Sequence, residues 1–357
     1  MEAIQYKCPN CGGSLEYRAD IQKFGCSFCL SEFTEQEIKL ICSDNENTDL
    51  SLQTESEPHA GDSQNVFESG NIYSCSSCGA QIMSDDNTAA TFCVYCHNPV
   101  ILKGRLSGTY KPSMVIPFSV ERENAVSLFR QTIMKKRFVP KDFRSEQTLE
   151  KMTGLYVPFW LADCRVRAHL SATGKVTRSW SQGSYRYTNV KEYQVSRGAD
   201  IRYTGIPADG ASKIDDSLMD AIEPYDYSKM QQFSMSYLSG FLADKYDVDK
   251  GGVFGRIKEK ADKATNEIMD SSVTGYSSVS VHNRSNSIIR TDWNYALLPV
   301  WFMTYSYNGK MYEFAVNGQS GVVAGIPPLS VKKLVLYCAA VFAVLTVLLA
   351  LGGFLLF

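Results

Sequence analysis

The chain has 357 residues, 11 cysteines and a formal net charge of −2. Its length corresponds to roughly two or three domains, and a hydrophobic share of 44% excludes wholesale disorder and a fibrous build. The near-zero net charge argues against a uniformly basic nucleic-acid binder, and a mean hydropathy of −0.18 excludes a multi-span transporter.

Eight of the cysteines form two sets with identical spacing. In each set two CxxC pairs are separated by 14 residues, and the second set repeats the first at an offset of 67 residues. The pairs are Cys8 and Cys11, Cys26 and Cys29, Cys75 and Cys78, and Cys93 and Cys96. One CxxC pair can grip a metal ion in a tight turn, and a second pair closes a tetrahedral site. The spacing predicts two small β-rich zinc ribbons, at 1–34 and 73–100, with one structural zinc ion each.

Disulfides and a thioredoxin-like redox motif are the alternatives for these pairs. Cytosolic chains seldom keep disulfides, and a redox CxxC normally occurs once, at the start of a helix. Four cysteine ligands leave no coordination position for water, so catalytic zinc is not expected. His97 follows Cys96 as either a substitute ligand or a surface histidine, whereas Cys42 and Cys164 are expected to be structural.

Charge is distributed unevenly along the chain. Residues 34–72 hold nine acidic residues and one basic residue, a composition that predicts an acidic flexible linker at 35–72. Residues 99–200 hold 18 basic and eight acidic residues, which indicates a solvated face or a patch for anionic lipid, an acidic partner or the linker itself. Residues 73–98 contain no lysine or arginine, so the ribbons lack the charge pattern of nucleic-acid binding.

Residues 101–330 are predicted to form an α+β body. Strands or hairpins are expected at 114–118, 156–161, 166–170, 175–200, 279–290, 297–307 and 311–317, and helices at 120–137, 228–247 and 256–271. The dipeptide Asn308-Gly309 predicts a type I′ hairpin turn. Residues 156–160 loosely echo residues 298–302, which raises the hypothesis that the body consists of two related halves.

Residues 331–357 are predicted to be a transmembrane anchor. The 24 residues from Leu334 to Phe357 contain no charge, and a helix of that length measures about 36 Å, enough to cross a bilayer core of about 30 Å. A buried core helix is the alternative. The preceding Lys332 and Lys333, with an N-terminus unlike a signal peptide, predict a single-pass protein of the cell membrane whose N-terminal bulk is cytoplasmic.

The motifs GxxxxGK, GxGxxG, GxSxG and HExxH do not occur in the sequence. We therefore expect no enzymatic activity, no catalytic residue and no small-molecule substrate.

Several stretches together resemble the bacterial TFIIB-type zinc-ribbon membrane proteins of Firmicutes. They are YKCPNCGG at 6–13, QKFGCSFC at 22–29, VIPFSV at 115–120, FVPKDF at 138–143 and TGLYVPFW at 153–160. Members of that family are often labelled primosomal protein N′ or PriA-like helicases, but this sequence lacks the helicase nucleotide-binding loop. Similar members are encoded beside PspA-like phage-shock proteins and SPFH (virion-core-like) proteins. The resemblance implies a membrane anchor that recruits such partners during envelope stress, with all eight paired cysteines as zinc ligands.

The leading functional hypothesis is a non-enzymatic, membrane-anchored zinc-ribbon adaptor that recruits cytoplasmic protein partners. The alternative is a nucleic-acid-binding zinc-ribbon protein tethered to the membrane, against which the charge distribution weighs.

Overall fold

The computed structural model describes residues 3–46, 71–75, 77–84, 86–93, 96–102 and 104–356. A sheet of 11 strands forms the centre of the molecule, and its main path runs β1-β8-β7-β13-β10-β14-β15-β16. Its strands are β1 (Ala3–Ile4), β7 (Thr88–Phe92), β8 (Pro99–Leu102), β9 (Met114–Val115), β10 (Thr153–Gln182), β11 (Tyr185–Asp209), β12 (Gln231–Gln232), β13 (Leu242–Asp244), β14 (Ser278–Tyr307), β15 (Lys310–Asn317) and β16 (Val323–Gly325).

Two smaller sheets and a set of helices complete the fold. The small sheets consist of β2 (Leu15–Arg18), β3 (Lys23–Cys26) and β4 (Glu32–Phe33), and of β5 (Asn71–Ser74) and β6 (Gln81–Ser84). The α-helices are α1 (Glu35–Glu46), α2 (Arg122–Thr132), α3 (Glu146–Leu149), α4 (Asp216–Ala221), α5 (Lys250–Ser271) and α6 (Val331–Leu356). Single 3₁₀ turns are η1 (Gly108–Tyr110), η2 (Asp142–Arg144), η3 (Tyr227–Lys229) and η4 (Met235–Leu238).

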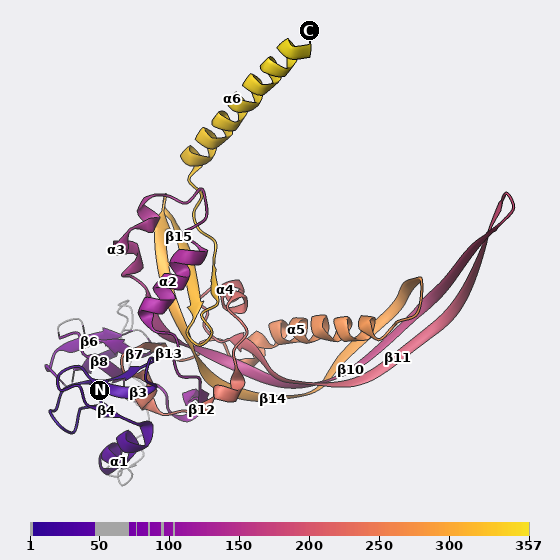
Figure 1. The fold of residues 1–357 in the computed structure, drawn as a ribbon. Helices are drawn as coiled ribbons and strands as arrows, with labels where there is room; N and C mark the ends of the chain where they lie inside the picture. The colour runs from indigo at the N-terminus through magenta and orange to yellow at the C-terminus, as the bar shows by residue number, and fades with distance from the viewer. Residues whose placement is uncertain are drawn as a thin grey trace, which may run out of the picture.

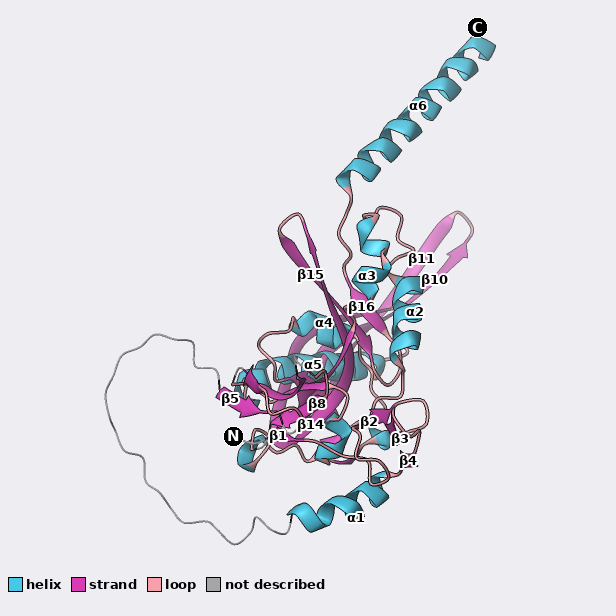
Figure 2. Cartoon of the chain, turned by 90° about the vertical axis from the view of Figure 1, so that its left-hand side faces the viewer, coloured by secondary structure: helices cyan, strands magenta, loops and turns pink. Residues whose placement is uncertain are grey.

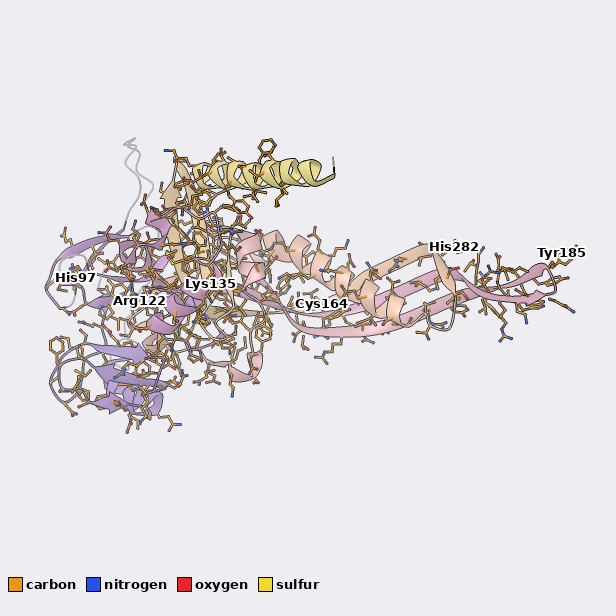
Figure 3. The ribbon with its side chains drawn as sticks, turned by 45° about the horizontal axis from the view of Figure 1, so that its top comes forward. His97, Arg122, Lys135, Cys164, Tyr185 and His282 are labelled. Atoms are coloured by element: carbon orange, nitrogen blue, oxygen red, sulfur yellow. The ribbon has the colours of Figure 1, made fainter. Side chains whose placement is uncertain are left out.

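Three long strands carry the sheet far beyond the body as a curved arm (Figure 1). The central strand β10 pairs antiparallel with β14 from Thr153 to Lys175 and with β11 from Phe159 to Gln182. Past Lys175 the arm is therefore a two-stranded hairpin, with Tyr185 at its tip (Figure 3). Helix α5 lies along the concave side of the arm (Figure 1) and buries Ile257 and Met269 against it.

The same order of elements occurs twice in the body. A short strand, a helix, a long strand and its hairpin partner follow one another as β9, α2, β10 and β11, and again as β13, α5, β14 and β15. Each short strand pairs in parallel with the long strand of the other set, β13 with β10 and β9 with β14. The echoing stretches at 156–160 and 298–302 lie side by side at the centre, where Val157 pairs with Leu298.

The structure confirms several predicted elements. The helix expected at 256–271 is present and begins earlier, at Lys250, because Asp249 caps it by accepting a hydrogen bond of 2.8 Å from the Gly252 amide. Asn308 and Gly309 both adopt positive φ, of 51° and 74°, and connect β14 to β15 as the hairpin prediction requires.

The predicted helix at 228–247 is wrong. That segment consists of η3, β12, η4 and β13, and Gly240 interrupts it with a φ of 93°. Its buried apolar residues include Tyr237, Leu238 and Phe241. Tyr237 packs against Tyr17 of the first cysteine set with ring centroids 5.3 Å apart, whereas Phe241 stacks on Phe118 of the body with ring centroids 4.1 Å apart.

The expected flexible linker at 35–72 is also partly wrong, because residues 35–46 form helix α1. The Thr34 hydroxyl and the Glu37 carboxylate form a reciprocal capping box that nucleates this helix. Ile38 is buried, and Tyr237 donates a 2.9 Å hydrogen bond to Glu35. Residues 47–70 of the expected linker lie outside the described residues.

Helix α6 leaves the body at its top (Figure 2), and no residue of its segment Val331–Leu349 is buried. Its segment Val331–Leu349 has a mean hydropathy of 2.1, so it is long and apolar enough to span a membrane. Its base is fastened to the loop after α2. Arg137 donates a 3.1 Å hydrogen bond to the Tyr337 hydroxyl, and Lys333 donates one of 2.7 Å to the Val139 carbonyl.

A buried ion cluster joins the arm to two helices. The carboxylate of Asp209, at the end of β11, is fully buried, and Arg256 of α5 contacts it at 2.9 Å. Arg256 also contacts Asp216 and Asp220 of α4, each at 2.8 Å. Burial raises the pKa of Asp209, and the Arg256 guanidinium opposes that rise.

We predict that Arg256→Met lowers the free energy of unfolding by about 3–5 kcal/mol, because it leaves the Asp209 charge buried without a partner. The control is Arg290→Met, which removes an exposed contact to Asp292 and should cost less than about 1 kcal/mol. Urea denaturation followed by tryptophan fluorescence measures both. Equal costs for the two variants would contradict the prediction.

Candidate metal centres

The structure brings the eight paired cysteines together in two clusters. Cys8, Cys11, Cys26 and Cys29 form one, and Cys75, Cys78, Cys93 and Cys96 form the other. We call residues 3–34 the first cysteine module and residues 71–102 the second. Within each cluster all four sulfurs lie within 4.8 Å of one another, although the two pairs come from different turns of the chain.

All four cysteine turns share one backbone geometry. The amide four residues after the first cysteine donates to that cysteine's carbonyl, and the cysteine's own amide donates to the carbonyl five residues on. The residue four positions after the first cysteine has a positive φ in every turn: 76° at Gly12, 60° at Leu30, 75° at Gly79 and 57° at His97. These turns place the first cysteine of each pair in the interior and leave the second more accessible.

This geometry explains His97, which the sequence left as either ligand or surface residue. The sulfur cluster is complete without it, and His97 occupies the left-handed position that glycine takes in the first turn of each module. Leu30 occupies the equivalent position in the first module. Neither residue is a glycine, so the sequence itself gives no sign of the left-handed position in the second turn of each module.

The sulfur separations fit a tetrahedral metal and exclude disulfides. Closest Sγ–Sγ distances are 3.5 Å for Cys8 and Cys29 and 3.5 Å for Cys11 and Cys26. In the second module they are 3.7 Å for Cys75 and Cys96 and 3.8 Å for Cys78 and Cys93. A tetrahedral ion with metal–sulfur bonds of about 2.3 Å requires sulfurs about 3.8 Å apart, whereas a disulfide requires about 2.05 Å. Both clusters can therefore hold a metal ion.

Both modules are docked on the body. Strand β7 of the second module pairs with β13, Ala90 opposite Ala243, and β1 of the first module pairs with β8 of the second. The first module also contacts the body directly, since the Tyr17 amide donates to the Ser239 carbonyl at 3.0 Å. Strand pairing and direct hydrogen bonds thus fix both modules relative to the body.

The outer turn of the first module exposes two apolar side chains beside its cysteines. Phe28 is 74% exposed and Leu30 is 80% exposed, one on each side of Cys29. Gly13 makes room for the Phe28 ring, because a Cβ at Gly13 would lie 2.5 Å from it. Phe28 is therefore held in place by the other turn of the module. We call Phe28 and Leu30 the knuckle tip.

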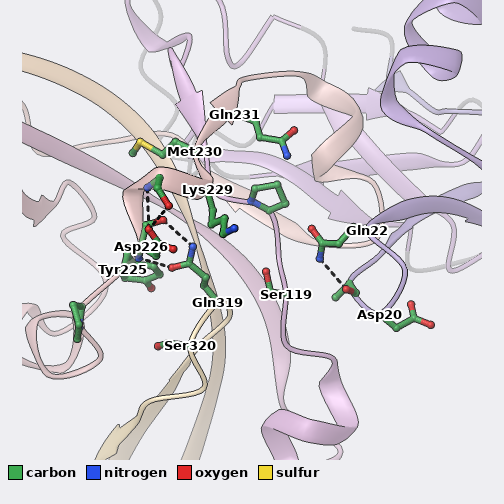
Figure 4. A pocket seen from close by; sticks show the side chains of 14 residues that line it. Asp20, Gln22, Ser119, Tyr225, Asp226, Lys229, Met230, Gln231, Gln319 and Ser320 are labelled. Atoms are coloured by element: carbon green, nitrogen blue, oxygen red, sulfur yellow. Dashed lines mark hydrogen bonds between the residues drawn. The ribbon is translucent and has the colours of Figure 1, made fainter.

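A cleft of about 960 Å³ separates the first module from the body (Figure 4). Gln22 bridges its wall by donating to the Phe118 carbonyl at 2.7 Å. Two carboxylates line the cleft, and both have structural partners. Asp20 pairs with Arg18 at the module surface, and Asp226 accepts a hydrogen bond from the Ser228 amide as the cap of η3. The Ser228 hydrogen bonds lower the pKa of Asp226, so neither carboxylate is set up as a proton acceptor.

Comparison with known proteins assigns the chain to a family. "Uncharacterized protein YdjG" of Bacillus subtilis (strain 168) is 31% identical over 335 residues, which cover 92% of each chain. The chain belongs to the YdjG family. No family model and no solved structure matches it. The similarity to YdjG extends over nearly the whole length of both chains.

We predict two metal ions per chain, one for each cluster. Cys26→Ser and Cys93→Ser should each remove one ion, because three sulfurs and a hydroxyl bind far more weakly than four thiolates. Elemental analysis of the purified full chain measures the stoichiometry. Cys164→Ser, which changes a buried cysteine facing Thr291, should keep both ions. Unchanged metal content in both cluster variants would reject the assignment.

Proposed function

We propose that this protein is a non-enzymatic zinc-ribbon adaptor that α6 anchors in the cell membrane. The carrying observation is the pair of closed four-cysteine clusters docked on one sheet with an unburied apolar helix on the same body. Four-sulfur clusters favour a structural role for their metal, since no ligand position is left for substrate or water.

Zinc is the metal we assign to both clusters, and the two cysteine modules are the TFIIB-type ribbons of the sequence resemblance. Tetrahedral four-thiolate sites built from paired CxxC turns are typical of structural zinc. The modules span about 30 residues each, too few to form a stable core alone. Zinc binding therefore supplies part of their folding free energy.

The residues around the base of α6 have the composition typical of a protein segment at a bilayer interface. Lys135, Lys136 and Arg137 are exposed near the base of α6, where Lys332 and Lys333 begin it. The Arg137 guanidinium lies 4.4 Å from the centre of the Tyr337 ring. Cations and a tyrosine at the start of an apolar helix favour the headgroup region of the cytoplasmic leaflet. We therefore place the body in the cytoplasm.

The knuckle tip is the surface that we propose for protein partners. Large exposed apolar side chains on a rigid turn resemble the buried anchors of protein interfaces. PspA-like and SPFH-family envelope-stress proteins are the partners that the family resemblance implies. Docking on the rigid module would concentrate such a partner beside the membrane.

The charges of the first module favour a protein partner over nucleic acid. Arg18 pairs with Asp20, and Lys23 lies 3.7 Å from Glu32. The second module has no lysine or arginine between residues 73 and 98. Binding to a phosphate backbone requires several unpaired lysine or arginine side chains. These modules do not offer them.

We predict that Phe28→Ser/Leu30→Ser abolishes partner capture while membrane insertion persists. The experiment is affinity purification of the full chain from detergent-solubilised, nuclease-treated membranes, with partners identified by mass spectrometry. Met311→Ser is the control, because Met311 is an exposed apolar residue on β15, far from the clustered cysteines in the sequence. Recovery of nucleic acid alone, or of the same proteins with the double variant, would contradict the proposal.

We also predict that the full chain resists carbonate extraction from membranes and that removal of residues 331–357 releases it into the soluble fraction. Protease added to intact cells should leave the cysteine modules uncut, and protease added to lysed cells should cut them. Cleavage in intact cells would reverse the proposed orientation.

A further inference from the structure

The hairpin at the end of the arm has two chemically different faces. Paired residues on antiparallel strands share a face, and the register pairs Trp180 with Tyr187 and Gln182 with Tyr185. We define the aromatic face of the hairpin as Val176, Arg178, Trp180, Tyr185, Tyr187, Lys191 and Tyr193. The opposite face is mainly polar, with Ser179 and Thr188 hydrogen-bonded to each other and Lys175 paired with Glu192, and it exposes one large apolar side chain, Val190.

The aromatic face is the continuation of the face that α5 covers. Nearer the body, the same alternation points Ala168, Leu170 and Ala172 of β10 into a core with Met269 of α5. At Gly174 the ring of Tyr276 takes over from the helix, since a Cβ there would lie 2.5 Å from it. Within the described residues, nothing covers the aromatic face beyond Tyr276. Trp180 is 50% exposed and Tyr185 is 72% exposed.

Although these side chains are exposed, two of their rings are held in a defined arrangement by contact with each other. The Trp180 and Tyr187 rings stack with centroids 5.6 Å apart and planes within 16°. Arg178 and Lys191 lie on the same face around a shallow hollow of about 440 Å³ and have no ion-pair partner among the described residues. A surface of tryptophan, tyrosine and free cations is the composition that proteins present to lipid headgroups.

The arm itself curves toward the end of the molecule from which α6 leaves (Figures 1 and 2). In Figures 1 and 2, the arm curves up on the side of the body from which α6 leaves, and its tip rises close to the level at which α6 begins. The concave side that carries α5 faces the same way (Figure 1).

We propose that the aromatic face of the hairpin binds the anionic surface of the membrane in which α6 is inserted. Tryptophan and tyrosine rings would lie among the headgroups, and Arg178 and Lys191 would contact anionic lipid phosphates. The protein then touches the bilayer at two points, α6 and the hairpin. This inference rests on the proposed membrane anchoring by α6.

The test uses the full chain in nanodiscs of brominated lipids, either anionic phosphatidylglycerol with phosphatidylcholine or phosphatidylcholine alone. Of the four tryptophans, Trp160 and Trp301 are buried, and Trp180 is on the hairpin. Bromine quenches only nearby tryptophan. We expect quenching in the anionic discs, loss of most of it in Trp180→Phe, and full quenching in the control Trp293→Phe, which changes a half-buried tryptophan near α5.

A second variant pair tests the charge contribution with all tryptophans intact. Arg178→Gln/Lys191→Gln should weaken hairpin association roughly fivefold per cation and reduce quenching. Arg165→Gln/Arg167→Gln removes the same charge from a part of the arm where both residues pair with Asp200, and should leave quenching unchanged.

The possible outcomes distinguish a failure of the hairpin contact from a failure of the anchoring by α6. A chain that does not enter nanodiscs refutes the anchoring by α6. A chain that enters them but shows no bromine quenching of Trp180 refutes the hairpin contact. Quenching of Trp180 by a single-stranded oligonucleotide, or its burial in a cross-linked dimer, with no response to brominated lipid would also overturn the inference.

Discussion

The pairing of β7 with β13 is the strand contact that joins both cysteine modules to the central strands of the main sheet. It spans only two residue pairs, Ala90 with Ala243 and Thr88 with Asp244. So short a pairing is stable only if β7 is already held in an extended form. The turn from Cys93 to Asn98 does this, because it joins β7 to β8 as the tight end of a hairpin. One cysteine turn of the second cluster is thus also the turn of the β7–β8 hairpin, whose strands belong to the main sheet.

The same logic carries to the first module, one step further from the body. Its turn from Cys26 to Ser31 joins β3 to β4, while β1 adds to the outer edge of β8. The Ser14 hydroxyl donates to the Asn98 side chain at 3.1 Å, next to the second cluster. The fold of one module therefore supports the position of the other. This arrangement differs from independent ribbons on a flexible tether, where each site would fold alone.

Local chemistry accounts for what the sequence predicted well. Cysteine spacing, the Asn308-Gly309 turn and the uncharged stretch after Lys333 each specify structure within a few residues. The helix predicted at 228–247 is absent because distant contacts position the segment's buried aromatic residues: Tyr237 packs against Tyr17 of the first module, and Phe241 against Phe118 of the body. Helix α1 was missed because an acidic composition hid a capping box and one buried residue, Ile38. Docking of the modules was not predictable, since short strand pairings leave no periodic signal.

The arm shows the limits of sequence reading in another way. Strands were expected at 156–161, 166–170 and 175–200, yet β10 runs without interruption from Thr153 to Gln182. Polar residues at its outward positions look like turns when the strand is read alone. They are explained once β11 and β14 are placed on its two edges and α5 on one face. The echo between residues 156–160 and 298–302 was visible in sequence, but its meaning as adjacent central strands was not.

A single strand connects the two ends of this architecture. Strand β10 pairs with β13, beside the second cysteine module, at Leu155 and Tyr156, and it reaches the hairpin at Trp180. At about 3.3 Å per residue, that interval is roughly 80 Å of continuous strand. A strand fixed beside the second cysteine module at one end and, in the proposed arrangement, by the membrane at the other would have little freedom to pivot about the base of α6. A partner docked at the knuckle tip would therefore sit at a defined position relative to the bilayer. Such geometric restriction raises effective concentration more than a flexible tether of equal length, because fewer orientations are sampled.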